Sequence, residues 1–199
     1  KELKRVIYAS SSSVYGDQTK FPTKENAVLK AKNPYGKTKI SNESQAKKYE
    51  KIYKIPFIGV RLFTVYGEWG RPDMFIIKLL NTIKKNKTFY LNNSGNHKRD
   101  FTYINDVIKI LIRLKSIKLN KDRIFNICGS NTVSIKIILK EIKKYFPNIK
   151  IKNIKKNRAD VKDTFGDNKL INSLLRYKKY TRYQLGIKKT VFWYKKYLL

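Results

Sequence analysis

Tyr35 and Lys39 stand four positions apart in the segment NPYGKTKISNE, residues 33–43. Positions i and i+4 lie on the same face of a helix, so a helix here would make the phenol and the ammonium neighbours. A phenol is a poor base at neutral pH, and a nearby ammonium favours its phenolate form. A phenolate can accept a proton from a hydroxyl while hydride leaves the same carbon. The spacing is therefore compatible with acid/base chemistry, but in a chain this rich in Tyr and Lys it is equally compatible with chance.

The elements around this pair predict how it would be positioned. The pattern from Pro34 to Lys54 is helical, with Asn33 available as N-cap and Pro34 at the first helical position. The apolar runs RVIYAS at 5–10, PFIGVRLF at 56–63 and RIFNICG at 123–129 are typical of buried parallel strands. The segment between residues 11 and 33 is polar and rich in turn formers, which predicts a loop.

The rest of the chain continues the alternation of strands and helices. We expect helices at 72–86, 104–118 and 134–146, with Asn105 or Asp106 near the start of the second. We expect a strand at 88–93, a loop at 65–73 and a turn at 94–100 that includes His97. This alternation predicts an α/β fold built on a parallel sheet.

The net charge of +32 raises the question of a nucleic-acid partner. Most of the 46 basic residues are lysines, which are spread along the chain and accompanied by no nucleic-acid-binding motif. Lys, Ile, Asn and Tyr are abundant and Ala is scarce, a pattern that favours codon bias acting on solvated positions. We therefore expect no specific nucleic-acid partner, although a basic protein bound to nucleic acid is the alternative from another functional class.

Other features of the composition limit the setting of the protein. The single Cys128 cannot form an internal disulfide, which suits a reducing, cytoplasmic environment, and we expect it to be buried. Apolar runs are broken by charges within a few residues, so we expect no membrane partner.

The chain begins without Met and enters a strand almost at once, and it has no Gly-rich turn for a dinucleotide pyrophosphate. We expect it to be the C-terminal part of a longer protein and inactive by itself.

Four segments in order carry a resemblance to a known family: VIYASSSSVYG at 6–16, NPYGKTKISNE at 33–43, GVRLFTVYGEWGRPDM at 59–74 and KRDFTYINDV at 98–107. The chain resembles the extended short-chain dehydrogenase/reductase family over nearly its whole length. Within that family it is most similar to the nucleotide-sugar 4-epimerases, particularly those acting on UDP-glucuronate. The resemblance implies NAD as cofactor, a UDP-sugar substrate, usually a homodimer, and no metal.

The resemblance also implies a fold and its division. It predicts the C-terminal part of a Rossmann-type doubly wound parallel sheet plus a smaller substrate-binding lobe. Residues 1–66 and about 104–130 would belong to the NAD-binding domain. Residues from about 67 to 103 and from 131 to 199 would form the substrate lobe.

Residue roles follow from the matching motifs. Tyr35 would be the catalytic base, Lys39 would hold the nicotinamide ribose and tune Tyr35, and Ser11 would hydrogen-bond the reacting oxygen. In the absence of the resemblance, a serine run in a loop is more simply turn chemistry. Ala9, Ser10 and Phe63 would join Tyr35 and Lys39 around the cofactor.

The substrate-binding residues come from the same motifs, and the segment FYLNN, residues 89–93, would lie along the uracil, with Asn92 in place of an aromatic residue common there. Arginine suits the geometry of a sugar diphosphate, and the late segment NRADV, residues 157–161, suggests an aspartate for the nucleotide ribose. The expected substrate-binding set is Ser12, Ser13, Thr64, Arg71, Arg99 and Asp160.

The residues after Ser11 discriminate among the family's reactions. Related dehydratases and decarboxylases place carboxylates there, whereas this chain has Ser12 and Ser13. A serine hydroxyl cannot replace a carboxylate as acid or base in those reactions. Hydroxyls can instead donate to a substrate carboxylate, together with Thr64. We therefore expect 4-epimerisation of a UDP-hexuronate through a 4-keto intermediate. A 4-epimerase of neutral or N-acetylated UDP-hexoses is the second reading, and an inactive nucleic-acid-binding protein is the third.

Overall fold

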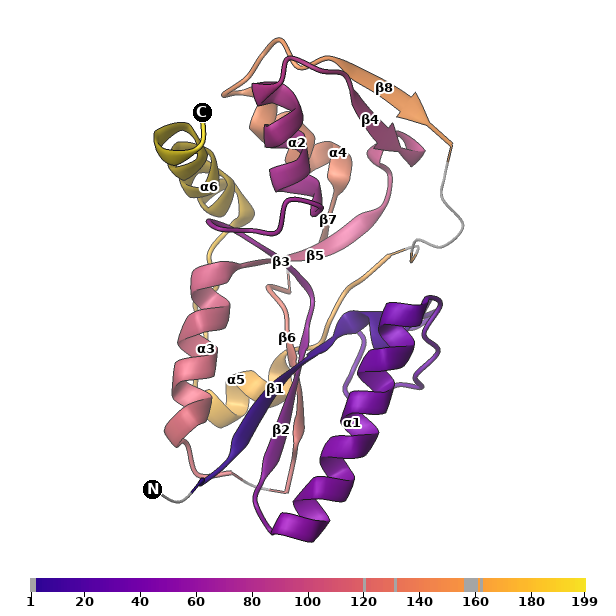
Figure 1. The fold of residues 1–199 in the computed structure, drawn as a ribbon, viewed down its shortest axis with the longest axis vertical. Coiled ribbons are helices and arrows are strands. Elements are labelled where there is room, and N and C mark those ends of the chain that lie inside the picture. The colour runs from indigo at the N-terminus through magenta and orange to yellow at the C-terminus, as the bar shows by residue number, and fades with distance from the viewer. Residues whose placement is uncertain (1–2, 120, 131, 156–160, 162) are drawn as a thin grey trace.

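A computed structural model describes residues 3–119, 121–130, 132–155, 161 and 163–199. Figure 1 shows two groups of elements joined by strands that pass from one group to the other. The lower group contains the helix that carries Tyr35 and Lys39, and the upper group contains the C-terminal helix.

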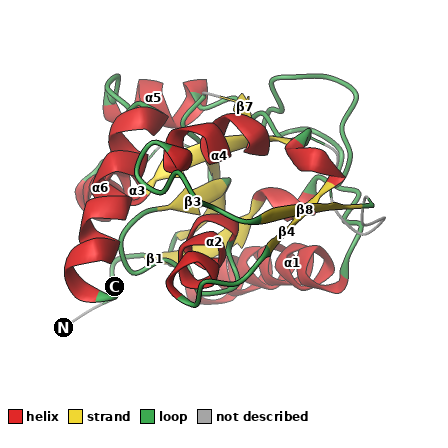
Figure 2. Ribbon diagram, turned by 90° about the horizontal axis from the view of Figure 1, so that it is seen from above, coloured by secondary structure: helices red, strands yellow, loops and turns green. Residues whose placement is uncertain are grey.

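The lower group is built on a parallel sheet. Its strands are β1 (Val6–Ser11), β2 (Phe57–Leu62) and β6 (Ile124–Ile127), in the order β1-β2-β6. Three helices cover it: α1 (Pro34–Tyr53), α3 (Ile104–Ser116) and α5 (Lys169–Leu175). Figures 1 and 2 show α1 on one face of the sheet and α3 with α5 on the other. The prediction of a parallel α/β sheet with helices on both faces is therefore confirmed.

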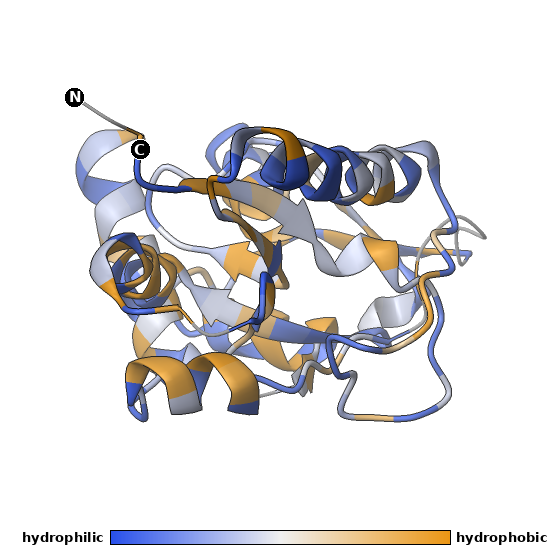
Figure 3. Ribbon diagram, turned by 90° about the horizontal axis from the view of Figure 1, so that it is seen from below, coloured by the Kyte–Doolittle hydropathy of each residue, from blue (hydrophilic) through white to orange (hydrophobic). Residues whose placement is uncertain are grey.

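Helix α1 begins and ends as its sequence predicts. The Asn33 side chain accepts a hydrogen bond from the backbone N–H of Gly36 at 2.8 Å, and Pro34 occupies the first turn. The helix ends at Tyr53, and the C-cap residue Lys54 adopts a left-handed conformation with φ 55°. Figure 3 shows α1 as mostly hydrophilic along its length, so most of this helix faces solvent.

The upper group combines short sheets with three helices. Strand β3 (Thr64–Tyr66) pairs in parallel with β5 (Lys98–Tyr103), and β5 pairs antiparallel with β7 (Thr132–Ser134). Strands β4 (Phe89–Asn92) and β8 (Ile151–Ile154) form a parallel pair. The helices are α2 (Phe75–Lys84), α4 (Ile135–Lys143) and α6 (Tyr183–Tyr197), and two short 3₁₀ turns lie at Ser12–Val14 and Asn93–Gly95.

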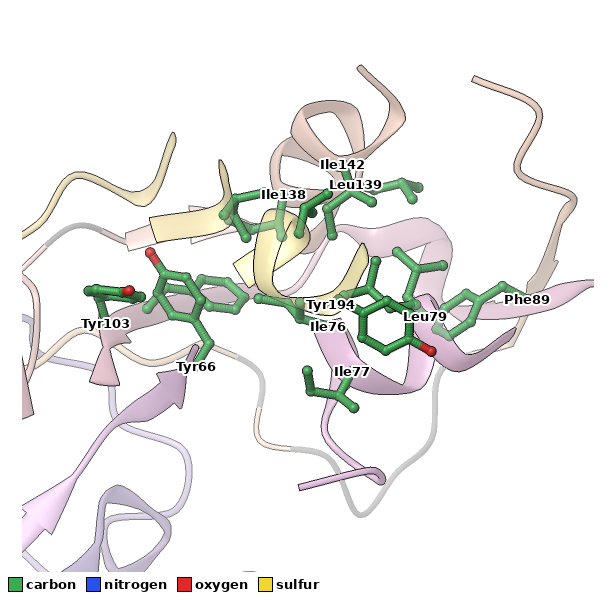
Figure 4. Close-up of a cluster of buried hydrophobic side chains, with 14 of the residues drawn as sticks. Tyr66, Ile76, Ile77, Leu79, Phe89, Tyr103, Ile138, Leu139, Ile142 and Tyr194 are labelled. Atoms are coloured by element: carbon green, nitrogen blue, oxygen red, sulfur yellow. The ribbon is translucent and has the colours of Figure 1, made fainter. Parts of the chain in front are cut away.

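Each group has its own hydrophobic cluster. In the upper cluster the aromatic rings of Tyr66 and Tyr103 lie beside the aliphatic side chains of α2 and α4 (Figure 4). The lower cluster joins β2, β6, α3 and α5, and includes Ile171 and Leu175. The predicted division places residues 131–199 in the second lobe, but α5 packs against the first sheet because its apolar face covers β6.

The structure differs from the sequence prediction at several element boundaries. Residues 98–100 belong to strand β5, whereas we expected a turn, and Asp100 within them is fully buried. His97, expected in the turn, is also buried. Helix α2 begins at Phe75, so Pro72 precedes the helix instead of starting it. Part of the expected loop at 65–73 is strand β3.

Within the described part of the chain, no helix is both long enough and apolar enough to cross a membrane.

Candidate functional site

Tyr35 and Lys39 lie at the carboxyl end of β1, where parallel sheets of this kind bind ligands. The Lys39 Nζ donates a hydrogen bond to the backbone oxygen of Ala9 at 2.9 Å. The same ammonium lies 5.6 Å from the centroid of the Tyr35 ring. Tyr35 is 48% exposed. The structure therefore brings the predicted pair together and leaves the phenol accessible to a ligand.

The 3₁₀ turn Ser12–Val14, which we call the serine turn, follows β1 and packs against α1. The Ser11 hydroxyl accepts a hydrogen bond from the Ser13 N–H at 3.1 Å, and donates to the Ser13 hydroxyl at 3.1 Å. A Cβ at Gly36 would lie 2.6 Å from the Ser13 carbonyl oxygen. Only glycine allows α1 to approach the turn this closely, and this approach sets Tyr35 beside the serines.

An open cavity of about 190 Å³ lies next to this turn. It is lined by Ser12, Ser13, Asn33, Thr64, Arg99, Val161 and Thr164. Four of the six predicted substrate-binding residues therefore share one cavity: Ser12, Ser13, Thr64 and Arg99. They come from three elements, namely the serine turn, the start of β3 and strand β5.

The two predicted arginines occupy different positions. The Arg99 guanidinium donates to the backbone oxygen of Val161 at 2.7 Å, at the wall of the cavity. Arg71 lines an adjacent hollow that also includes Thr64. Its guanidinium forms a bidentate pair with Asp73, and the hydrogen bond and charge of Asp73 raise the pKa of Arg71. Both side chains of this pair are well exposed, so Arg71 can exchange Asp73 for a phosphate at little cost.

Ser10 and Phe63 are buried, and neither lines the cavity. The Ser10 hydroxyl donates to Glu43 at 2.5 Å, beneath the site. Phe63 packs under the serine turn against Val14 and Tyr15. Asp160, the predicted ribose ligand, lies outside the residues that the structure describes.

Sequence reasoning missed a buried polar network beneath the site. Glu43 of α1 and Arg61 of β2 form a bidentate ion pair, with distances of 2.8 and 2.7 Å, and each residue is 4% exposed. Burial opposes the charge of Arg61, but its hydrogen bonds to Glu43 and Tyr15 outweigh burial and raise its pKa. Burial also raises the pKa of Tyr15 to about 12. An arginine in an otherwise apolar strand was the available signal, because a buried guanidinium requires a partner.

The network also fixes the loop between β1 and α1. Arg61 donates to the Tyr15 hydroxyl and to the Glu25 backbone oxygen, both at 2.8 Å. Tyr15 in turn donates to the Asn126 side chain of β6 at 2.6 Å. The serine turn is therefore held from below by residues of two strands.

A segment at residues 163–167 ties the two groups together across the site. The backbone N–H of Thr23 donates to Phe165 O at 2.8 Å, on the side of the lower sheet. On the other side, Thr164 N donates to Lys98 O at 3.1 Å and Gly166 N donates to the Asp100 carboxylate at 3.2 Å. We call residues 163–167 the strap. Thr164 of the strap lines the cavity.

Cys128, the single cysteine of the chain, does not line the cavity. Cys128 is fully buried, and burial raises the pKa of its thiol well above the usual value. The buried position confirms the sequence prediction. Among the described residues, no group of three or more His, Cys, Asp or Glu side chains could hold a metal ion.

Comparison with known proteins identifies the family. Residues 1–128 match the NAD dependent epimerase/dehydratase family. The chain belongs to this family. It is 39% identical over 196 residues to the uncharacterized protein MJ1055 of Methanocaldococcus jannaschii, covering 97% of this chain and 60% of that protein. It is 35% identical over 210 residues to UDP-glucuronate 4-epimerase 4 of Arabidopsis thaliana, covering 96% of this chain and 48% of that protein.

A solved structure supports the same relationship. The UDP-glucuronic acid 4-epimerase of Bacillus cereus, in complex with UDP-glucuronic acid and NAD, superposes with a TM-score of 0.89 at 29% identity. The match covers 98% of this chain and 63% of that one. The chain therefore spans about half to two thirds of the length of these relatives. The predicted Rossmann-type fold and the predicted family are both confirmed.

Proposed function

We propose that the intact protein is an NAD-dependent 4-epimerase of a UDP-hexuronate. The observation that carries this proposal is the shared cavity of Ser12, Ser13, Thr64 and Arg99 beside the Tyr35–Lys39 pair. Three hydroxyls and one guanidinium offer donors to an anionic sugar. The relatives that act on UDP-glucuronate support the same substrate class.

The residues at the end of β1 fit the nicotinamide riboside of NAD. An ammonium has three donors, and Lys39 uses one of them on the Ala9 oxygen. Among the residues that the structure describes, the Lys39 ammonium has no second hydrogen-bond acceptor, so two donors remain for ribose hydroxyls. When bound, NAD would supply reversible hydride transfer at C4 of the sugar. Lys39 would therefore have two tasks, which are to bind the ribose and to stabilise the phenolate of Tyr35.

Tyr35 would accept the proton of the C4 hydroxyl and later return it. Ser11 lies at the end of β1 with its hydroxyl hydrogen-bonded to Ser13, and it would orient the reacting oxygen. The resulting 4-keto sugar would turn in the cavity before the ketone is reduced on its other face. No net oxidation results, so the cofactor can stay bound through the cycle.

The serine turn favours epimerisation over elimination or decarboxylation. Ser12 and Ser13 have no carboxylate to protonate a leaving hydroxyl or to abstract a proton at C5. They can donate hydrogen bonds to the uronate carboxylate together with Thr64, which satisfies this charge once water is excluded. A 4-keto uronate is a β-keto acid that can lose carbon dioxide. Holding its carboxylate in the ring plane suppresses that loss, because the breaking bond then overlaps poorly with the ketone.

The proposal is tested by incubating the intact protein and NAD with UDP-glucuronate, UDP-galacturonate and UDP-glucose in parallel. We expect interconversion of the two uronates, with little UDP-pentose and slow turnover of UDP-glucose. Faster turnover of UDP-glucose, or UDP-pentose as the main product, would overturn the assignment.

A further inference from the structure

The outward face of α6 combines lysines with exposed apolar side chains. The helix buries Gly186, Ile187, Thr190, Val191 and Tyr194 against the upper group. Its opposite side is exposed and consists of Leu185, Lys188, Lys189, Phe192, Lys195 and Lys196, which we call the α6 face. Leu185 is 49% exposed and Phe192 is 56% exposed. The helix is thus amphipathic, with a polar side that is basic and carries large apolar groups.

Trp69 extends the α6 face. Its ring lies 5.2 Å from that of Trp193 on α6, centroid to centroid, in an edge-on arrangement. Trp69 is 78% exposed, more than any other large hydrophobic side chain in the described part of the chain. Its backbone is left-handed with φ 57°, which is unfavourable for a bulky residue. An exposed tryptophan favours an interface between an apolar phase and water, because its ring is apolar and its indole N–H is polar.

The charged residues of the α6 face are all lysines, while Glu68, next to Trp69 in the sequence, accepts a hydrogen bond from the Tyr103 hydroxyl at 2.7 Å. No acidic residue follows Asp167 in the sequence. Among the residues that the structure describes, none of the four lysines of the α6 face forms an ion pair. Helix α4 packs beside α6 (Figure 1) and adds four exposed lysines, of which Lys144 pairs with the buried Glu141 at 2.7 Å. These four are Lys136, Lys140, Lys143 and Lys144.

We propose that the α6 face binds the surface of a membrane that contains anionic lipid. Lysines would lie among the headgroups, while Trp69, Phe192 and Leu185 would enter the boundary between headgroups and acyl chains. Such a face would bind a bilayer without crossing it, whereas the expectation of no membrane partner was based only on the lack of a spanning segment.

Two other occupants fit the α6 face less well. A second copy of the chain would bring two strongly positive surfaces together, because the net charge is +32. A nucleic acid is better matched by arginine, which binds phosphates bidentately, and α6 contains none. The apolar side chain of Leu185 would also gain nothing from contact with a phosphate backbone. An anionic bilayer uses both the lysines and the apolar side chains.

Vesicle binding tests the proposal. The protein would be sedimented with vesicles of 70% phosphatidylcholine and 30% phosphatidylglycerol, and with pure phosphatidylcholine vesicles as comparison. We expect binding to the mixed vesicles alone and weakening with added salt. Trp69 and Trp193 are the two tryptophans of this chain, so their emission should shift to shorter wavelength on binding.

Matched variants distinguish the α6 face from the overall charge. Replacement of Lys188, Lys189, Lys195 and Lys196 by Gln should weaken vesicle binding by about tenfold or more. The control replaces Lys37, Lys47, Lys48 and Lys51 on the exposed side of α1 by Gln, which removes the same charge and should change binding less than about threefold. Circular dichroism would verify that both variants are folded.

Three outcomes would overturn the proposal. One is no binding to the mixed vesicles, and another is equal weakening by the two variants. The third is binding to single-stranded RNA at salt concentrations at which the vesicles are not bound. A Phe192→Ser variant provides a further check, because it keeps every charge and should still reduce both binding and the tryptophan shift.

Discussion

At the scale of single residues, Tyr35 and Lys39 form the centre of the proposed chemistry. The Tyr35 phenol is half exposed, and Lys39 is fixed on the Ala9 oxygen close to the phenol ring. The geometry thus supplies an accessible hydroxyl and a positioned cation.

Tyr35→Phe should remove the proton acceptor and leave the fold intact, since the Tyr35 side chain is about half exposed. We expect kcat of the intact protein to fall by about a hundredfold or more, as is typical for the loss of a general base. Steady-state kinetics with UDP-glucuronate measures this. Near wild-type turnover would assign the base to another residue.

Thr64→Ala should act on the substrate carboxylate and not on the hydride step. Thr64 lines both the cavity and the adjacent hollow that contains Arg71. We expect about a tenfold rise in KM for UDP-glucuronate, the cost of one hydrogen bond to a charged group, and more UDP-pentose. Thr38→Ala on the exposed side of α1 is the control. An unchanged KM and product ratio would remove Thr64 from the carboxylate site.

At the scale of elements, helix α1 illustrates what can be predicted from sequence. Asn33, Pro34 and the apolar strands on either side act locally, so the start of the helix and the neighbouring strands were predicted correctly. Strand β5 was missed because Lys98, Arg99 and Asp100 are typical of a turn. The Asp100 Oδ2 accepts a hydrogen bond from the N–H of Gly166, 66 residues away, and no local pattern reveals that partner.

In the candidate site too, local motifs were predicted from the sequence and long-range contacts were not. The order of the motifs was enough to name Ser12, Ser13, Thr64 and Arg99, which the structure places in one cavity. The supporting pair of Glu43 and Arg61 was not predicted. It joins a helix to a strand, and single-sequence patterns do not specify such a contact.

Glu43→Gln should destabilise the protein strongly, because it leaves the buried Arg61 without a counter-charge. We expect a loss of about 3–5 kcal/mol in the free energy of unfolding, measured by urea denaturation. The matched control is Asp17→Asn, which removes the exposed pair with Lys32 and should cost about 1 kcal/mol or less. Similar losses in both variants would contradict the structural role of the buried pair.

Gly36→Ala should move the serine turn away from α1. The new Cβ would lie 2.6 Å from the Ser13 oxygen and 2.8 Å from the Ala31 Cβ. We expect a loss of about 1–3 kcal/mol in stability from overpacking and a fall in kcat larger than that of a Ser44→Ala control on the exposed side of the helix. Wild-type activity in Gly36→Ala would show that this close approach is not needed.

At the scale of the whole molecule, the strap joins the two groups of elements across the cavity. It bonds to Thr23 on one side and to Lys98 and Asp100 on the other. The cavity therefore lies between the part that resembles a nucleotide-binding sheet and the part that carries Arg71 and Arg99, the arginines predicted to bind a sugar diphosphate.

The 199-residue chain by itself should bind NAD poorly. Its sequence has no Gly-rich turn to hold the pyrophosphate at a helix N-terminus, and it spans only 60% of its Methanocaldococcus relative. Titration calorimetry should detect no binding in the micromolar range. Micromolar affinity would show that the pyrophosphate is held by other residues of this chain.

We propose that the intact protein inverts a UDP-hexuronate at C4 by removal and return of the same hydride. The most direct test follows UDP-glucuronate carrying deuterium at C4 through the reaction of the intact protein with NAD. We predict UDP-galacturonate that retains the deuterium at C4, as seen by mass spectrometry and NMR. Loss of the deuterium to solvent, or a product changed at another carbon, would contradict this mechanism.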